Sequence, residues 1–319
     1  MAKATLLESG TQYASSRRLV IKLRRQKYLF LMLIPGLIVV FTFSYLTLAG
    51  WIMAFKDYRV GLNLWKAEWT GFYQFKSFLM QSSDYIYLLR NTLAMNISML
   101  LVNLIAAFLF AVLINEIRSG WFSRLVQTLS FFPFFVSWVI VYAIMHSLFA
   151  VSTGAVNLSL VNLGVLNEGL DLLGSPQYAW LLAIGIMLWK TLGYNGVIFI
   201  AAIASIDADQ YEAADMDGAT RIQKIMHITI PNLLPTLIVL LIINSGWILN
   251  SNFEFYFLFT NPTNWSRMEV LDMYIYKNGL QLTNYSYATA VGIIKTLVSI
   301  LIVVGVNILS RKTTGKSIM

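Results

Sequence analysis

Six long stretches of this sequence are apolar enough to cross a lipid bilayer, and they constrain the fold more than any other feature. A bilayer core is about 30 Å thick, so about 20 apolar helical residues are needed to span it. Each stretch is expected to be helical, because hydrocarbon offers no partner for free backbone groups. Pro35 and Pro133 lie inside two of them and are expected to kink their helices. The predicted spans cover residues 29–55, 91–115, 125–150, 178–206, 233–252 and 285–309.

The composition points to the same class of protein. Charged residues make up 12% of the 319-residue chain and hydrophobic residues 58%, with a mean hydropathy of +0.67. An ordinary soluble domain carries roughly 25% charged residues. These values exclude a soluble globular enzyme, a disordered chain and a nucleic-acid-binding domain. We therefore predict an all-α integral membrane protein with six transmembrane helices. The chain has no cysteine, and no metal site or catalytic residue is predicted.

The distribution of Lys and Arg predicts the orientation. With the N-terminus inside, 14 basic residues fall in inner segments and 7 in outer segments, and basic residues favour the inside. Residues 1–28 are then a cytoplasmic basic arm, 29–309 the transmembrane domain and 310–319 a cytoplasmic tail. The outer segment 56–90 is the exception, because it carries five basic residues of its own. We expect the excess positive charge to bind anionic membrane lipid and not nucleic acid.

Two lysines lie within predicted spans, where a lysine costs about 2.5–3.5 kcal/mol. Both are therefore expected to face the bundle interior, a partner helix or a watery path. A structural alternative for Lys190 is hydrogen bonding to backbone carbonyls or to Asn195 or Asn244. Nearby aromatic rings and amides suit a sugar, because rings stack on its apolar faces and amides pair with its hydroxyls. The candidate substrate path is Lys190, Tyr194, Asn195, Asn244, Trp247, Asn250, Asn252 and Lys295.

Residues 207–231, between the fourth and fifth predicted spans, carry strong local signals. Asp207 is expected to cap one short helix, and Gly218 suits its C-terminal end. Thr220 is expected to cap a second short helix, with a glutamine three residues later. We predict two short helices here, and acidic side chains on one face of the first.

The order of residues in this segment resembles the EAA signature of the permeases of binding-protein-dependent ABC importers. That signature reads E-A-A, two residues, D-G-A, eight residues, I, two residues, P, and every place is filled. Ile230 departs from it, because the family usually has Leu there. The matching residues, together with an aspartate on the same helix face, are Glu212, Ala213, Ala214, Asp215, Asp217, Gly218, Ala219, Ile228 and Pro231.

Other segments resemble the MalF/UgpA-like superfamily, and most of all its polysaccharide-type, LplB-like branch: residues 115–116, 125–128, 132–133 and 285–292. The resemblance implies a type I ABC importer permease in the bacterial cytoplasmic (inner) membrane, with both termini in the cytoplasm. It implies a heterodimer with a second permease subunit, two ATP-binding subunits and an extracytoplasmic solute-binding protein. The EAA segment would be the coupling helix, with Glu212 pairing with a basic residue of the ATPase and Gly218 allowing the turn.

The resemblance also bears on chemistry and cargo. ATP and Mg²⁺ would be bound by the partner ATPase, so this chain would be a transport subunit without a cofactor or an ATPase site. The cargo would be an oligosaccharide or polysaccharide fragment, moved by alternating access. Two intramembrane lysines suit an acidic, uronate or alginate type of sugar. A neutral oligosaccharide or another small polar solute remains the alternative.

Two other classes of function remain open. An intramembrane enzyme could use Lys190, His146 or Glu254, but these residues lie at different predicted depths. A stand-alone channel or secondary transporter would need no partner ATPase, and it would be expected to show inverted repeats. The two are distinguished from an importer subunit because either would work without ATP hydrolysis by another chain.

Overall fold

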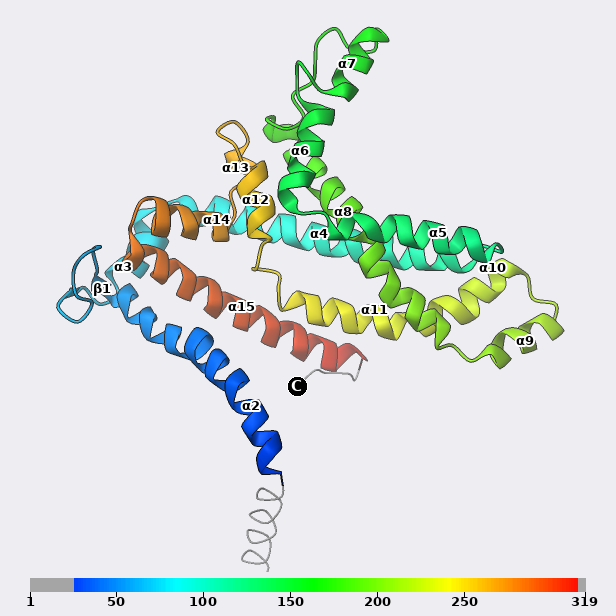
Figure 1. Cartoon of the computed structure of the whole chain (residues 1–319), viewed down its shortest axis with the longest axis horizontal. Coiled ribbons are helices and arrows are strands. Elements are labelled where there is room, and N and C mark those ends of the chain that lie inside the picture. The colour runs from blue at the N-terminus through cyan, green and yellow to red at the C-terminus, as the bar shows by residue number, and fades with distance from the viewer. Residues whose placement is uncertain (1–25, 315–319) are drawn as a thin grey trace, which may run out of the picture.

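The computed structural model describes residues 26–314, which are mostly helical (Figure 1). Residues 1–25 of the predicted arm and 315–319 of the predicted tail lie outside the described residues. By length and composition, five helical segments can cross a membrane, and a bent pair makes a sixth. They match the six predicted spans in order, which confirms the all-α membrane fold. The segments are Lys27–Phe55, Asp84–Asn115, Gly120–Phe135 with Trp138–Phe149, Pro176–Ala204, Arg221–Ser245 and Tyr285–Ile308.

The spans are built from helices of three types. The longer α-helices are α2 (Lys27–Val40), α4 (Asp84–Asn115), α8 (Pro176–Ala204), α11 (Ile230–Ser245) and α15 (Tyr285–Thr314). The shorter ones are α3 (Tyr73–Lys76), α5 (Gly120–Phe131), α6 (Trp138–Phe149), α7 (Ala155–Asn162), α9 (Ala208–Met216), α10 (Arg221–Lys224), α12 (Phe253–Phe259), α13 (Trp265–Met268) and α14 (Leu271–Tyr276). Turns of π-helix are η1 (Phe41–Tyr45), η3 (Ser77–Gln81), η5 (Ile225–Thr229) and η6 (Lys277–Gln281). The 3₁₀ segments are η2 (Leu46–Phe55) and η4 (Phe132–Phe135), and the short strands β1 (Lys56–Asp57) and β2 (Glu68–Trp69) pair antiparallel.

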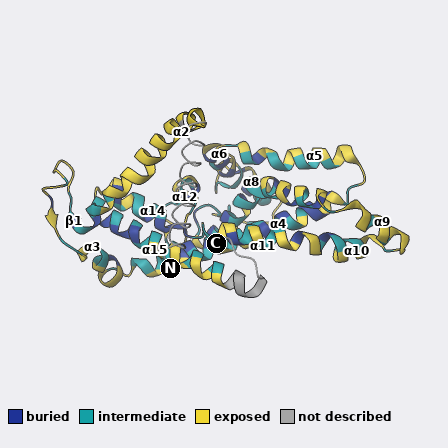
Figure 2. Cartoon of the chain, turned by 90° about the horizontal axis from the view of Figure 1, so that it is seen from below, coloured by how far each residue is buried: buried dark blue, intermediate teal, exposed yellow. Residues whose placement is uncertain are grey.

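The helices pack into a bundle from which two parts extend (Figure 1). In the bundle, α4 packs along α8, and α11 contacts α4, α8 and α15. The α2 helix diverges from the other spans, and Figure 2 shows it exposed along its length. The second extension carries α6 and α7. The α9 helix lies at one end of the bundle and β1 at the opposite end.

The third span is broken, not merely kinked, just after the segment that contains Pro133. Its first part is α5 with the 3₁₀ turn η4, which ends at Phe135, and it meets α6 at an angle of 104°. Proline has no N–H to donate, and Ser137 caps the new helix by accepting a hydrogen bond from the Ile140 N–H. The α8 helix approaches this break closely at Gly193, where an added Cβ would lie 2.2 Å from the Ser130 carbonyl oxygen. Pro35, by contrast, lies inside the continuous span Lys27–Phe55.

The fifth span differs from its prediction at both ends. The predicted second short helix of residues 207–231 is wrong as a separate element, because α10, η5 and α11 run on as one span from Arg221. Pro231 therefore lies inside a continuous helix, shortly after the π-helical turn η5. At the other end the helix stops at Ser245, and residues 246–252 are turns and extended chain instead of the predicted helix.

Candidate functional site

The first candidate site is the short helix α9. Residues at its two ends determine where the helix begins and where it stops. The Asp207 carboxylate caps it by accepting a hydrogen bond of 3.1 Å from the Asp209 N–H. After its last turn Gly218 has a φ of +74°, in the left-handed region that favours glycine. Thr220 and Gln223 then form a reciprocal capping box that starts α10. The predicted caps at both ends are confirmed.

Side-chain contacts fasten α9 to the beginning of the fifth span. Lys224 Nζ lies 2.7 Å from Asp215 Oδ1. The Tyr211 and Thr229 hydroxyls lie 2.9 Å apart, and Thr229 is almost fully buried. Only three residues, 205–207, separate α9 from α8. The α9 helix is therefore attached to both the fourth and the fifth spans.

The predicted coupling residues present a mostly exposed surface. Glu212, Ala213, Asp215, Asp217, Gly218 and Pro231 are exposed, whereas Ala214, Ala219 and Ile228 are half-buried. The prediction missed two apolar residues beside them, Met216 and Ile222, which are 89% and 73% exposed. Large apolar side chains placed together on a polar loop are typical of a protein contact surface. The signal available in the sequence was a methionine directly between two aspartates.

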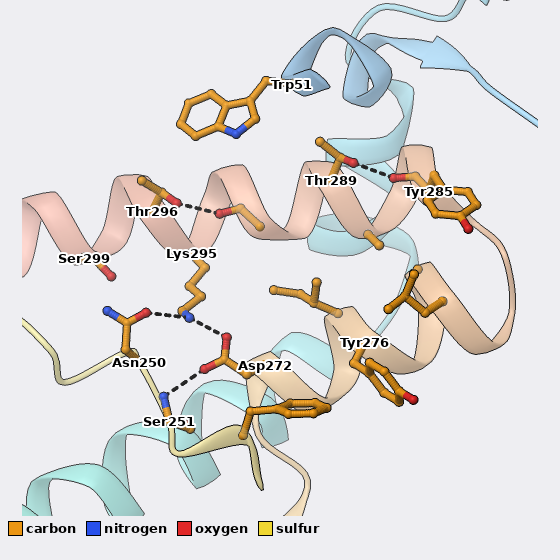
Figure 3. A pocket seen from close by; sticks show the side chains of 16 residues that line it. Trp51, Asn250, Ser251, Asp272, Tyr276, Tyr285, Thr289, Lys295, Thr296 and Ser299 are labelled. Carbon is orange, nitrogen blue, oxygen red and sulfur yellow. Dashed lines mark hydrogen bonds and ion pairs between the residues drawn. The ribbon is translucent and has the colours of Figure 1, made fainter. Parts of the chain in front are cut away.

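The second candidate site is a hollow of about 840 Å³ beside α15 (Figure 3). The other walls come from η2, α14, η6, the unwound residues 250 and 251, and the first residue of α12. Four polar side chains of α15 lie in its wall: Thr289, Lys295, Thr296 and Ser299. Polar side chains on a spanning helix are costly against lipid, so their position indicates a watery or protein-covered space.

Lys295 lines this hollow, and its ammonium group contacts two other polar side chains. Its Nζ forms an ion pair with Asp272 Oδ1 and donates a hydrogen bond of 2.8 Å to Asn250 Oδ1. The other carboxylate oxygen of Asp272 accepts a hydrogen bond of 2.8 Å from the Ser251 N–H (Figure 3). The lysine charge is thus balanced by Asp272, and the same carboxylate fixes the unwound end of the fifth span.

A smaller hollow of about 250 Å³ lies between α4, α8 and α11, and Asn250 lines both hollows. It brings together five of the predicted path residues: Asn195, Asn244, Trp247, Asn250 and Asn252.

Two asparagines of the second span line this smaller hollow and were missed by the prediction, which named no residue of that span. Asn103 donates to Thr191 Oγ1 (2.7 Å) and accepts a hydrogen bond of 2.8 Å from Asn195. Asn96 donates to the Ile248 carbonyl oxygen (2.7 Å). The two asparagines stand seven residues apart in an apolar span, a spacing that places them on one helix face.

The remaining two predicted path residues, Lys190 and Tyr194, contact the break in the third span. Lys190 is 6% exposed, and its Nζ donates to the carbonyl oxygens of Pro133 (3.2 Å), Phe134 (3.0 Å) and Val136. The ring of Tyr194 stacks on that of Phe134, with centroids 4.2 Å apart. The contacts of Lys190 are those of its structural alternative, and they place it outside both hollows.

Known proteins resemble this chain over nearly its whole length. Residues 103–315 match the family of binding-protein-dependent transport system inner membrane components. Protein LplB of Bacillus subtilis (strain 168) is 41% identical over 290 residues, which cover 91% of this chain and 90% of LplB. The polygalacturonan/rhamnogalacturonan transport system permease protein YteP of the same organism is 38% identical, over 93% of this chain and 91% of YteP.

A solved structure agrees with the fold as well. It is that of a bacterial ABC transporter involved in the import of the acidic polysaccharide alginate. The matched chain is 36% identical, with a TM-score of 0.84, and the match covers 93% of this chain and 99% of that one. The family match spans well over half of this chain, and the relatives align with it from end to end. This chain therefore belongs to the family of binding-protein-dependent transport system inner membrane components.

Proposed function

We propose that this chain is one of two membrane subunits of an ATP-driven importer for acidic oligosaccharides. Its partners are a second permease subunit, two ATP-binding subunits and an extracytoplasmic solute-binding protein. The chain crosses the bacterial inner membrane with both termini in the cytoplasm. ATP and Mg²⁺ bind to the ATP-binding subunits, and this chain itself has no enzymatic role.

The observation that carries this proposal is the attachment of α9 to two spans. An exposed acidic helix with Met216 and Ile222 beside it suits docking into a second protein. Glu212 is exposed on this helix and pairs with a basic residue of the ATP-binding subunit. Because α9 is fastened to the fourth and fifth spans, movement of that subunit rocks the bundle, as alternating access requires.

The substrate path in this proposal follows the two hollows that meet at Asn250. Amide side chains and aromatic rings line both, which is the mixture that sugar hydroxyls and apolar sugar faces require. Lys190 and Tyr194 are not part of this path, because they are used in the break of the third span. The path residues kept are Asn195, Asn244, Trp247, Asn250, Asn252 and Lys295, with Asn96 and Asn103 added.

The acidic cargo is supported by the relatives and not by the lysines. YteP is named for polygalacturonan, and the solved transporter imports alginate, so both relatives handle chains of uronic acids. The charge of Lys295 is balanced by Asp272, and Lys190 is held by carbonyl oxygens. Recognition of sugar carboxylates would then come from hydrogen-bond donors such as the asparagine amides. A neutral oligosaccharide is the second candidate, because the same balanced charges also suit it.

The test is uptake into vesicles that hold the complete complex with its binding protein. Labelled alginate pentasaccharide and a neutral oligosaccharide of equal length are supplied in turn, with ATP and without it. We expect accumulation of the acidic sugar alone, and only with ATP.

The possible outcomes test two parts of the proposal separately, namely the acidic cargo and the ATP-driven import. ATP-dependent uptake of the neutral sugar alone would overturn the acidic cargo and leave the importer in place. Uptake of either sugar at the same rate without ATP would instead indicate a channel, and the importer proposal would be wrong.

A further inference from the structure

Residues 56–81 form a compact unit at the end of the first span, which we call the hairpin platform. It contains the β1–β2 pair, α3 and η3. Figure 1 places it at the end of the bundle opposite α9. The proposed import function does not use it, and its basic residues are the exception in the charge distribution.

Phe55, the last residue of the first span, holds the platform at the end of that span. The carbonyl oxygen of Phe55 accepts hydrogen bonds from the Thr70 N–H (2.9 Å) and the Gly71 N–H (3.0 Å). The Phe55 ring also packs on those of Trp69 and Phe72, with centroids 5.9 Å and 5.5 Å apart. The chain therefore returns, after the hairpin, to the level at which the first span ends.

Internal contacts make the platform a rigid body. The buried side chain of Lys56 donates to the Leu64 and Trp65 carbonyl oxygens, at 3.0 Å and 3.2 Å. The Tyr58 N–H donates to Ser286 Oγ (2.9 Å) at the start of α15. The hairpin is thus held to two spans, and its exposed side chains have fixed positions.

Those exposed side chains are largely apolar and aromatic. Each of seven is more than half exposed: Val60, Leu62, Trp65, Trp69, Phe72, Tyr73 and Met80. Two exposed lysines, Lys66 and Lys76, lie among them. Amphipathic rings with neighbouring basic groups are the combination enriched at membrane–water interfaces.

We propose that the hairpin platform rests on the phospholipid surface, with its rings at the boundary of headgroups and acyl chains and its lysines on phosphate groups. The height fixed by Phe55 puts the rings at this boundary. The proposal also accounts for the basic residues of this outer segment. Lys56 is used inside the hairpin, Arg59 pairs with Asp57 at 3.2 Å, and Arg90 donates to the Ser266 carbonyl oxygen. Lys66 and Lys76 remain directed outward for lipid.

The absence of cysteine from the sequence allows a direct test. Val60→Cys and Leu62→Cys each carry a nitroxide label in the complete complex, in vesicles of phosphatidylcholine and phosphatidylglycerol. Leu163→Cys is the matched control, because Leu163 is an apolar residue, 76% exposed, directly after the last residue of α7. Collision rates are measured with oxygen, which concentrates in the bilayer, and with a water-soluble nickel chelate.

We expect a higher ratio of oxygen to nickel collisions at both platform positions than at position 163. A ratio equal to that of the control would place the platform in water and overturn the proposal. Low collision rates with both reagents would show that another protein covers it, and would also overturn the proposal. Neither side chain makes a polar contact in its described surroundings, so both labels test the native surface.

Discussion

Lys190 is the residue on which the broken third span depends. A helix that ends at a break leaves carbonyl oxygens without N–H partners, and here they lie inside the bundle. The lysine donates to three carbonyl oxygens at the break, and its ammonium lies 5.0 Å from the centre of the Trp138 ring. One of the three, that of Pro133, also accepts a hydrogen bond from the Val136 N–H. A break in one span is thus stabilised by a side chain of another.

Replacing this lysine should lower stability. Lys190→Met fills the same space but removes the donors, and each buried carbonyl left unsatisfied costs about 1–3 kcal/mol. We expect a lower midpoint of thermal unfolding for the purified complex, followed by intrinsic fluorescence. Tyr194→Phe is the control on the same helix, because it keeps the stacked ring. An unchanged midpoint for Lys190→Met would show that the three hydrogen bonds contribute nothing.

Single residues also show what the sequence can and cannot predict. Lys190 and Lys295 stood out because a charge inside an apolar span is rare. Their partners could not be predicted, since Asp272 and the Pro133 carbonyl lie far away in the chain. The caps at Asp207 and Thr220 were predictable, because each is satisfied within three residues.

At the scale of elements, prolines were the main source of error. The second short helix was expected to end before the fifth span began at residue 233, yet the helix runs through both Pro231 and Pro235. The π-helical turn η5 precedes them, and such local adjustments re-satisfy the backbone where a proline removes an N–H. The third span, by contrast, breaks shortly after Pro133, and Lys190 of another span donates to carbonyl oxygens at this break. The effect of a proline thus depends on neighbours that a local pattern does not contain.

The turn after α9 offers a test of the coupling element. At Gly218 an added Cβ would meet nothing within 4 Å, so its positive φ, and not crowding, demands glycine. Gly218→Val should separate ATP hydrolysis from sugar uptake, because a β-branched residue resists this conformation.

Gly218→Asn is the matched control, since asparagine tolerates the left-handed region. Both activities are measured in vesicles with the complete complex. The coupling role of α9 would be contradicted if Gly218→Val transported as well as Gly218→Asn.

At the scale of the whole molecule, the two extremities have different surfaces. The end with α9 is acidic and carries exposed Met216, whereas the end with the hairpin platform is aromatic and basic. The bundle joins them through largely apolar spans, which suit lipid and partner helices. In the two proposals, an ATP-binding subunit docks at the α9 end and lipid holds the hairpin platform at the other end. Movement of α9 would then displace the bundle relative to a platform that stays at the membrane surface.

The orientation of this chain in the membrane can be tested with two introduced cysteines. One full span, α8, separates Leu163 from Met216, so the two must lie on opposite sides of the membrane if α8 crosses it. Leu163→Cys should react with a membrane-impermeant maleimide in intact cells, and Met216→Cys only after permeabilisation. Both side chains are apolar and more than 70% exposed, so their reactivity differs by location and not by burial. Labelling of both from outside would show that α8 does not cross, and labelling in the reverse order would place α9 where no ATP-binding subunit could reach it.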